Sequence, residues 1–194
     1  MKKQLILGTF IGAIVLFVWS FIAWTFLPWP GEPLRSFAND EAIVAAIKAN
    51  APRSGNYLLP NEVKRTPGMT EDQFQKATQN ASNRMMQGPM VFAAVRLEPF
   101  DSFPKALGIK FLTLLIAALL ATFLLLQTNG LSYAKRVLFL TIPAALIFLG
   151  TNADEWNWWG FSNAYSAMQL SVLLIGWFIA GLVMAIFVRG RLTA

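Results

Sequence analysis

The sequence contains no cysteine and no histidine among its 194 residues. Without cysteine the chain can form no disulfide, no thiolate metal site and no cysteine nucleophile. Without histidine it lacks the commonest general base near neutral pH and the usual protein ligand of haem, copper and zinc. We therefore expect no intrinsic redox chemistry, no metal site and no cofactor.

Charged side chains are also scarce, at 13% of the residues, whereas 56% of the residues are apolar. In a soluble domain roughly a quarter of the residues are charged. The composition therefore predicts that most of the chain lies in a lipid bilayer and that a smaller part forms a domain outside it.

The first apolar run, Leu5–Leu27, predicts a transmembrane helix. Its 23 uncharged residues exceed the roughly 20 that a helix needs to cross the hydrocarbon core. A cleaved signal peptide is the alternative. The run is too long for one, however, and it continues into Pro28–Trp29–Pro30 without a small-residue cleavage pattern. We therefore interpret residues 1–27 as an uncleaved anchor.

Residues 105–194 predict a transmembrane region of three further helices, at about 106–127, 133–152 and 164–188. The middle helix is the least regular of the three, because its apolar run has only 14 residues, 137–150, and contains Pro143. A tilted or re-entrant segment is the alternative at this place.

Charge placement predicts the orientation, because basic residues in short loops favour the cytoplasmic side of a membrane. With the N-terminus inside, the cytoplasmic segments hold no acidic residue and six basic ones, Lys2, Lys3, Lys135, Arg136, Arg189 and Arg191. We therefore predict a multi-pass protein of the bacterial inner membrane, with both termini cytoplasmic and residues 28–104 and 153–163 periplasmic. Because the net charge of +6 is this orientation signal, it does not indicate a nucleic-acid partner.

Residues 28–104 predict a small α+β domain. Asn39 is a good N-cap for a helix with the sequence EAIVAAIKAN, and Thr70–Gln73 matches a capping box that opens a second helix. The segments Gly55–Pro60 and Met90–Leu97 are typical of strands, although their pairing direction stays open. The predicted fold is a mainly α membrane protein, a four-transmembrane-helix bundle with a small α+β extracytoplasmic domain between helices 1 and 2.

Small residues recur four positions apart in two of the predicted spans. Such spacing lets helix backbones approach closely. The candidate packing residues are Gly8, Gly12, Gly176, Ala180, Gly181 and Ala185. They serve either packing within this chain or association with another membrane protein.

An outer loop between the last two spans is unusually rich in tryptophan and acidic residues. The candidate interaction residues of this loop are Asp154, Glu155, Trp156, Trp158, Trp159 and Phe161. An aromatic belt at the membrane interface is one interpretation, because the indole ring is apolar and its N–H is polar. The alternative is a surface for a lipid, a quinone or a partner, at which the two carboxylates meet a cation.

A serine–lysine hydrolase needs neither histidine nor cysteine, and the outer domain contains Ser54, Ser82, Lys64 and Lys76. Neither serine lies in a nucleophile motif. In addition, no ionisable residue lies in the middle of a predicted span, where such residues mark proton relays and ion paths. We therefore predict that the chain is not an enzyme.

Together these patterns favour a non-enzymatic accessory or scaffold subunit of a larger membrane complex, with the lipid bilayer and other membrane protein subunits as partners. The alternative is a membrane protein that handles a lipid or another hydrophobic ligand through the outer Trp-rich loop and carries a bound lipid. An intramembrane enzyme ranks third.

Overall fold

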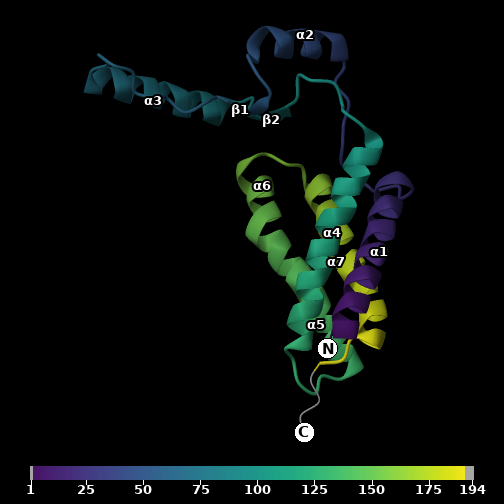
Figure 1. Ribbon diagram of the computed structural model, residues 1–194. Helices are drawn as coiled ribbons and strands as arrows, with labels where there is room; N and C mark the ends of the chain where they lie inside the picture. The colour runs from purple at the N-terminus through teal and green to yellow at the C-terminus, as the bar shows by residue number, and fades with distance from the viewer. Residues whose placement is uncertain (1, 191–194) are drawn as a thin grey trace. The chain divides into compact units, whose positions relative to one another are not determined.

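The computed structural model describes residues 2–190. Its elements in chain order are α1 (Lys2–Thr25), α2 (Asp40–Asn50), β1 (Gly55–Leu59), α3 (Glu71–Gln87), β2 (Val91–Val95), α4 (Phe103–Leu126), α5 (Tyr133–Ile147), η1 (Phe148–Asn152), α6 (Ala153–Trp158) and α7 (Asn163–Phe187) (Figure 1). They form two compact units, which we describe separately. The bundle unit comprises the described residues of Met1–Leu34, Phe100–Trp156 and Phe161–Ala194, and the sheet unit comprises Arg35–Pro99 and Asn157–Gly160.

Four helices of the bundle unit are long and apolar enough to cross a membrane. They are α1, α4, the continuous helix Tyr133–Trp158 and α7, with 24, 24, 26 and 25 residues. The prediction of four membrane-length apolar helices is therefore confirmed for residues 2–190.

The third of these helices is longer than the sequence predicts. It continues past Asn152 through α6 to Trp158, so residues 153–158 are helical. Pro143 lies inside α5 without ending it. A π-helical turn, η1, then joins α5 to α6, and the Thr151 hydroxyl donates to the Ile147 carbonyl oxygen at 2.6 Å. The apolar run looks short because the helix continues into polar sequence, where backbone hydrogen bonds still hold it.

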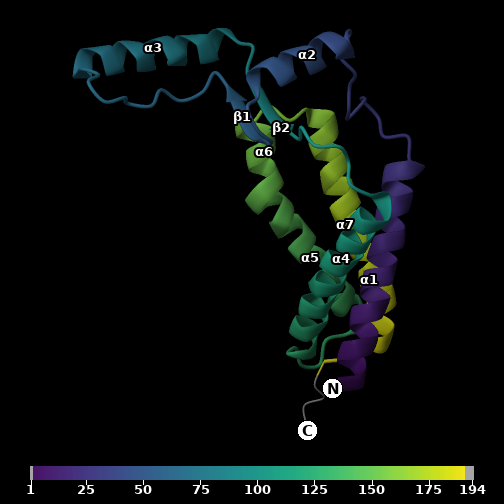
Figure 2. The ribbon, with the colours of Figure 1, turned by 45° about the horizontal axis from the view of Figure 1, so that its top comes forward.

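Within the bundle unit α1 packs against both α4 and α7, and α5 packs against α7, whereas α4 and α5 make little contact with each other (Figure 2). The core lies between these helices and is centred on Leu16, Leu125, Leu140, Met184 and Val188. Side chains on the outer faces are apolar and exposed, as a lipid-facing helix requires.

One end of the bundle unit carries five of its seven described basic residues, while Lys105 and Lys110 lie near the start of α4. The backbone N–H of Arg189, after α7, donates to Gln4 Oε1 in the first turn of α1 at 3.2 Å. The Tyr133 hydroxyl, at the start of α5, donates to the Leu182 carbonyl oxygen near the end of α7 at 2.8 Å. This end, which we call the basic end, holds no acidic residue among the described residues and holds Lys2, Lys3, Lys135, Arg136 and Arg189. Arg191, which the sequence adds to this set, lies outside the described residues.

The sheet unit is built on a two-stranded antiparallel ladder of β1 and β2, with Gly55 opposite Val95 and Leu59 opposite Val91. This register settles the pairing direction that the sequence left open. Asn39 Oδ1 caps α2 by accepting from the Ala42 N–H at 2.9 Å. The capping box at the start of α3 is also confirmed, since Thr70 and Gln73 exchange both hydrogen bonds.

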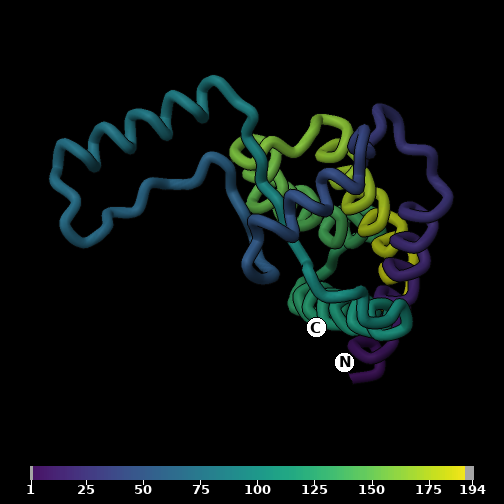
Figure 3. The backbone as a smooth tube through the Cα atoms, turned by 90° about the horizontal axis from the view of Figure 1, so that it is seen from above, coloured from purple at the N-terminus to yellow at the C-terminus, as the bar shows by residue number. Residues whose placement is uncertain are grey.

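Residues 60–90, which we call the arm, connect β1 to β2. The chain leaves β1 in an extended segment and returns through α3, which lies beside that segment (Figure 3). Arg65 links the two parts, because its Nη2 lies 2.8 Å from Glu71 Oε2 and its Cζ lies 5.5 Å from the centre of the Phe74 ring. No residue of α3 is buried. The arm is therefore held by its own exposed contacts and not by a hydrophobic core.

Candidate functional site

The small residues of α1 lie where this helix crosses two others. A Cβ atom added to Gly8 would lie 2.6 Å from side-chain methyl carbons of both Thr122 on α4 and Val188 after α7. A Cβ atom added to Gly12 would lie 2.7 Å from Met184 Sδ. Both glycines are therefore needed for the close approach of α1 to its neighbours.

Gly176 on α7 receives the indole ring of Trp19 from α1. A Cβ atom at Gly176 would lie 2.6 Å from Trp19 Cδ1, and Trp19 Nε1 donates to the Val172 carbonyl oxygen at 2.9 Å. The missing side chain of the glycine thus makes room for an aromatic ring whose N–H is satisfied inside the bundle.

Gly181 lies against the backbone of α5, where an added Cβ would be 3.2 Å from the Val137 carbonyl oxygen. Ala180 and Ala185 are fully buried on the same helix. The six small residues that the sequence singled out are thus buried in contacts within this chain. A contact of these residues with another protein stays a prediction.

We expect Trp19→Phe to reduce the stability of the bundle, because it removes the hydrogen bond to Val172 while keeping an aromatic ring. Interhelical hydrogen bonds in membranes contribute about 0.6 kcal/mol on average and up to about 1.7 kcal/mol. Unfolding in mixed micelles, followed by circular dichroism, measures the loss. The control is Trp24→Phe, because the Trp24 side chain is about half exposed and makes no hydrogen bond among the described residues. Equal losses in the two variants would contradict the prediction.

The Trp-rich loop of the sequence is divided in the structure. Asp154, Glu155, Trp156 and Trp158 lie on the short helix α6. Within the bundle unit, Trp156 Nε1 donates to Asn163 Oδ1 at 2.7 Å, and the backbone N–H of Phe161 donates to the Glu155 carbonyl oxygen at 3.2 Å. These bonds join the end of the third span to the start of α7.

Residues 157–160 instead belong to the sheet unit. The Trp159 ring lies 5.1 Å from the Phe92 ring on β2, centre to centre. Gly160 has a φ of +76°, and a Cβ atom there would lie 3.5 Å from Met90 Cε. Trp158 remains 65% exposed. No pattern in the sequence indicates that the tip of this segment packs on a strand.

The acidic pair Asp154 and Glu155 does not join a larger carboxylate cluster. Among residues 2–190 no group of three or more acidic side chains is placed to hold a metal ion. Glu155 Oε2 already accepts from Asn152 Nδ2 at 3.1 Å. The Glu155 carboxylate is thus held by a side chain of the same continuous helix.

Ser54, one of the two serines weighed as a nucleophile, has a carboxylate partner. Its hydroxyl donates to Glu98 Oε2, and its oxygen accepts from the Leu97 backbone N–H at 2.8 Å. Lys76, one of the two lysines weighed as a catalytic partner, instead forms an ion pair with Asp72, with 2.8 Å between Lys76 Nζ and Asp72 Oδ2. Ser54 thus ties the two strand ends of the sheet unit together.

The hydrogen bond between Ser54 and Glu98 affects the pKa of the Glu98 carboxyl. The pKa of Glu98 lies below its ordinary value, chiefly because of the Ser54 hydrogen bond and further because of a bond from its own backbone and the charge of Arg96, while burial opposes the shift. A lowered folded-state pKa stabilises the fold above the unfolded pKa, and this contribution is lost as the pH falls through the folded pKa. We expect Ser54→Ala to raise the pKa of Glu98, as measured by NMR titration. Ser82→Ala is the control that should leave it unchanged.

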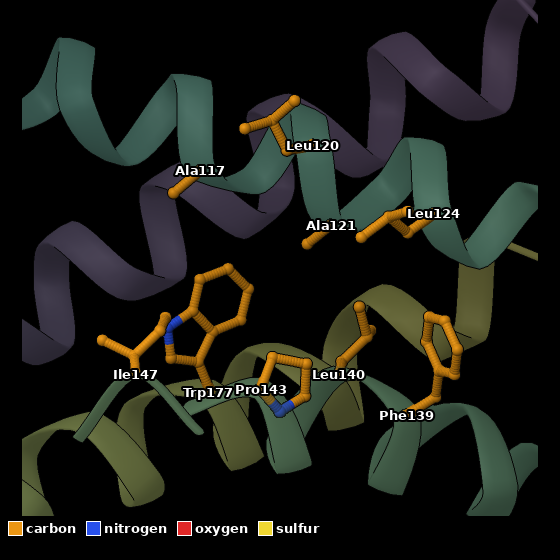
Figure 4. A pocket seen from close by; sticks show the side chains of 9 residues that line it. All are labelled: Ala117, Leu120, Ala121, Leu124, Phe139, Leu140, Pro143, Ile147 and Trp177. Atoms are coloured by element: carbon orange, nitrogen blue, oxygen red, sulfur yellow. The ribbon is translucent and has the colours of Figure 1, made fainter. Parts of the chain in front are cut away.

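A groove in the bundle unit was not foreseen from the sequence. It has a volume of about 220 Å³ and lies between α4 and α5, with Trp177 of α7 between them (Figure 4). Its lining residues are Ala117, Leu120, Ala121, Leu124, Phe139, Leu140, Pro143, Ile147 and Trp177. The groove arises because α4 and α5 contact each other little and because α4 offers two alanines at this level.

Four apolar helices of membrane-spanning length and a small sheet unit define a chain compatible with a multi-pass membrane protein. Comparisons with models of protein families, with curated proteins and with solved structures find no match to it.

Proposed function

We propose that the protein is a non-enzymatic accessory or scaffold subunit of a larger membrane complex. One observation carries the proposal: within the sheet unit only Ala51 and Pro60 are buried. A folded unit of this size normally needs a hydrophobic core or a covalent staple, and the sequence has no cysteine. A surface supplied by a partner would bury the side chains that this unit leaves exposed.

The arm is the part of the sheet unit that is best suited to such a partner. The exposed fractions of Met85 and Met86 on α3 are 47% and 87%. Methionine is frequent on binding surfaces because its flexible thioether adapts to different shapes. An exposed polar helix without tertiary packing is also only marginally stable in water, so a partner that packs against α3 would stabilise it.

The proposed orientation places both termini in the cytoplasm of a bacterium and the sheet unit in the periplasm. It is supported by the basic end, which holds five basic residues and no acid among the described residues. The acidic residues of the bundle unit lie towards the opposite helix ends: Glu32 follows α1, Asp101 precedes α4, and Asp154 and Glu155 lie on α6 in the last turns of the third span.

Crosslinking mass spectrometry on native membranes tests the proposal. Lys64 and Lys76 both lie on the arm and are available to a lysine-reactive reagent, while Lys48 on α2 serves as an internal comparison. We expect reproducible crosslinks from the arm lysines to one other membrane protein. Recovery of crosslinks within single chains alone would contradict the proposal.

Handling of a lipid or another hydrophobic ligand is the second candidate. It is favoured by the exposure of neighbouring aromatic side chains, 51% for Trp156 and 65% for Trp158. Native mass spectrometry in mild detergent would then find a retained ligand that Trp158→Ala removes. Phe123→Ala, at an exposed aromatic on α4, is the control. A ligand retained equally by both variants would sink this candidate.

A further inference from the structure

Arg136 places a guanidinium group at the basic end without a carboxylate partner. Its Nη1 donates to the Leu131 carbonyl oxygen at 2.7 Å and its Nη2 to the Ala185 carbonyl oxygen at 3.1 Å. Its Nε is buried and has no hydrogen-bond partner, and no ion pair among the described residues includes it. A buried donor on a cation is costly without an acceptor. The buried Nε is closed to outside molecules, but each Nη nitrogen keeps a second N–H beside its bond to a carbonyl oxygen. These two donors suit an anion from outside the chain.

Arg136 lies on the same face of α5 as the groove. The groove residues of this helix are Phe139, Leu140, Pro143 and Ile147, which follow Arg136 by three, four, seven and eleven positions. Residues at these spacings form one stripe on a helix. Along α5, Arg136 therefore precedes the first groove residue by about one helical turn, roughly 5 Å of helix.

The groove itself is apolar along its length. Ala117 and Ala121 leave space on the α4 side, and the Trp177 ring lies between α4 and α5 (Figure 4). An apolar channel between membrane-spanning helices is filled by hydrocarbon, because neither water nor an ion is stable there.

The guanidinium of Arg136 and the apolar groove that follows it along α5 together suit one kind of bilayer molecule, a lipid with an anionic headgroup. The guanidinium fork suits a phosphate oxygen pair, and the absence of acids at the basic end leaves the local field positive, with Arg189 adding to it. A free phosphate would leave the groove unexplained, and a neutral hydrocarbon would leave Arg136 unpaired. An acyl chain joined to a phosphate satisfies both.

We propose that this is a binding site for an anionic phospholipid, with the phosphate at Arg136 and one acyl chain in the groove between α4 and α5. The site is independent of the accessory role, and its phosphate end at Arg136 lies at the other end of the third span from α6.

The test uses the full chain in vesicles of equal parts phosphatidylcholine and phosphatidylglycerol with identical acyl chains, followed by native mass spectrometry in mild detergent. One basic residue near an anionic membrane surface is worth about 1 kcal/mol, so we expect roughly a fivefold preference for retained phosphatidylglycerol. Arg136→Gln should abolish the preference. Lys135→Gln, which removes an exposed neighbouring charge, should keep most of it.

A second variant addresses the groove and leaves Arg136 in place. Ala121→Phe should fill the groove and lower the total amount of retained lipid, whereas Ala106→Phe, at an exposed position near the other end of α4, should retain as much as the unchanged protein. The α-helical circular dichroism of each variant establishes that it is folded.

Four results would overturn the proposal. The first is equal retention of the two lipids by the unchanged protein. The second is undiminished retention by Ala121→Phe. The third is a dimer mass that Ala121→Phe removes, because a second copy of the chain would then occupy the groove. The fourth is loss of the retained lipid in Trp158→Ala together with unchanged retention by Arg136→Gln, because the lipid would then lie at the α6 end.

Discussion

Replacing Gly8 with leucine is expected to lower the free energy of unfolding of the bundle by about 3 kcal/mol, the upper end of what overpacking costs. Gly8 lies where α1 meets α4 and the end of α7. An added Cβ atom would already be 2.6 Å from carbons of Thr122 and Val188, before the rest of the leucine side chain is placed.

The two neighbours of Gly8 have little freedom to move. Thr122 and Val188 are both fully buried. Both are also β-branched, so their χ1 angles are restricted. The leucine can therefore be accommodated only by moving α1 away from its partners, which loses the dispersion contacts that hold helices together in lipid.

Gly108 provides a matched control for this substitution. It also lies on a membrane-length helix, α4, but an added Cβ atom would find nothing within 4 Å. Gly108→Leu should change the stability by no more than about 0.5 kcal/mol, as is usual for a surface position. Unfolding in mixed micelles with increasing fractions of denaturing detergent compares the two variants. Similar losses at both positions would show that the α1 crossing is not tightly packed.

Hydropathy predicts the long helices of this chain well, because lipid imposes both their length and their composition. The predicted span 106–127 corresponds to Phe103–Leu126, and 164–188 corresponds to Asn163–Phe187. The third helix departs from its prediction at its outer end. The helix runs on to Trp158 through a π-turn at 148–152 and the polar residues that follow. Hydropathy does not predict this extension, because these polar residues carry no apolar signal.

Local signals in the outer segment were also sufficient for its elements. Asn39 and Thr70 specify helix starts through bonds to residues three positions away. The pairing of β1 with β2 joins residues that are far apart in sequence, with an intervening helix. No local pattern encodes that direction.

The candidate sites show the same division between local and distant information. Spacing alone identified Gly8 and Gly181 as residues of close approach, because lipid offers helices few other ways to associate. The groove depends on how α4 and α5 diverge, which neither helix specifies by itself. Arg136 carried an orientation signal in the sequence, whereas its unpaired Nε becomes visible only once α5 lies beside α7.

Replacing the whole arm, residues 60–90, with an Asn-Gly turn is expected to separate folding from partner binding. Leu59 and Val91 are opposite each other in the antiparallel ladder, and Asn-Gly favours the short turns that close such hairpins. Because α3 buries no residue, the bundle should unfold at the same detergent fraction as in the unchanged chain. Because Lys64 and Lys76 are removed with the arm, the readout is co-purification of the other membrane protein, which should be lost.

A matched variant distinguishes loss of the arm from loss of its apolar contact. Met86→Asp changes the most exposed apolar side chain of α3, whereas Gln79→Asp places the same charge at an exposed position elsewhere on that helix. We expect Met86→Asp to reduce partner recovery severalfold and Gln79→Asp to preserve it. The amount of partner that co-purifies with each variant measures this recovery. Full partner recovery without the arm would contradict the arm as the binding surface.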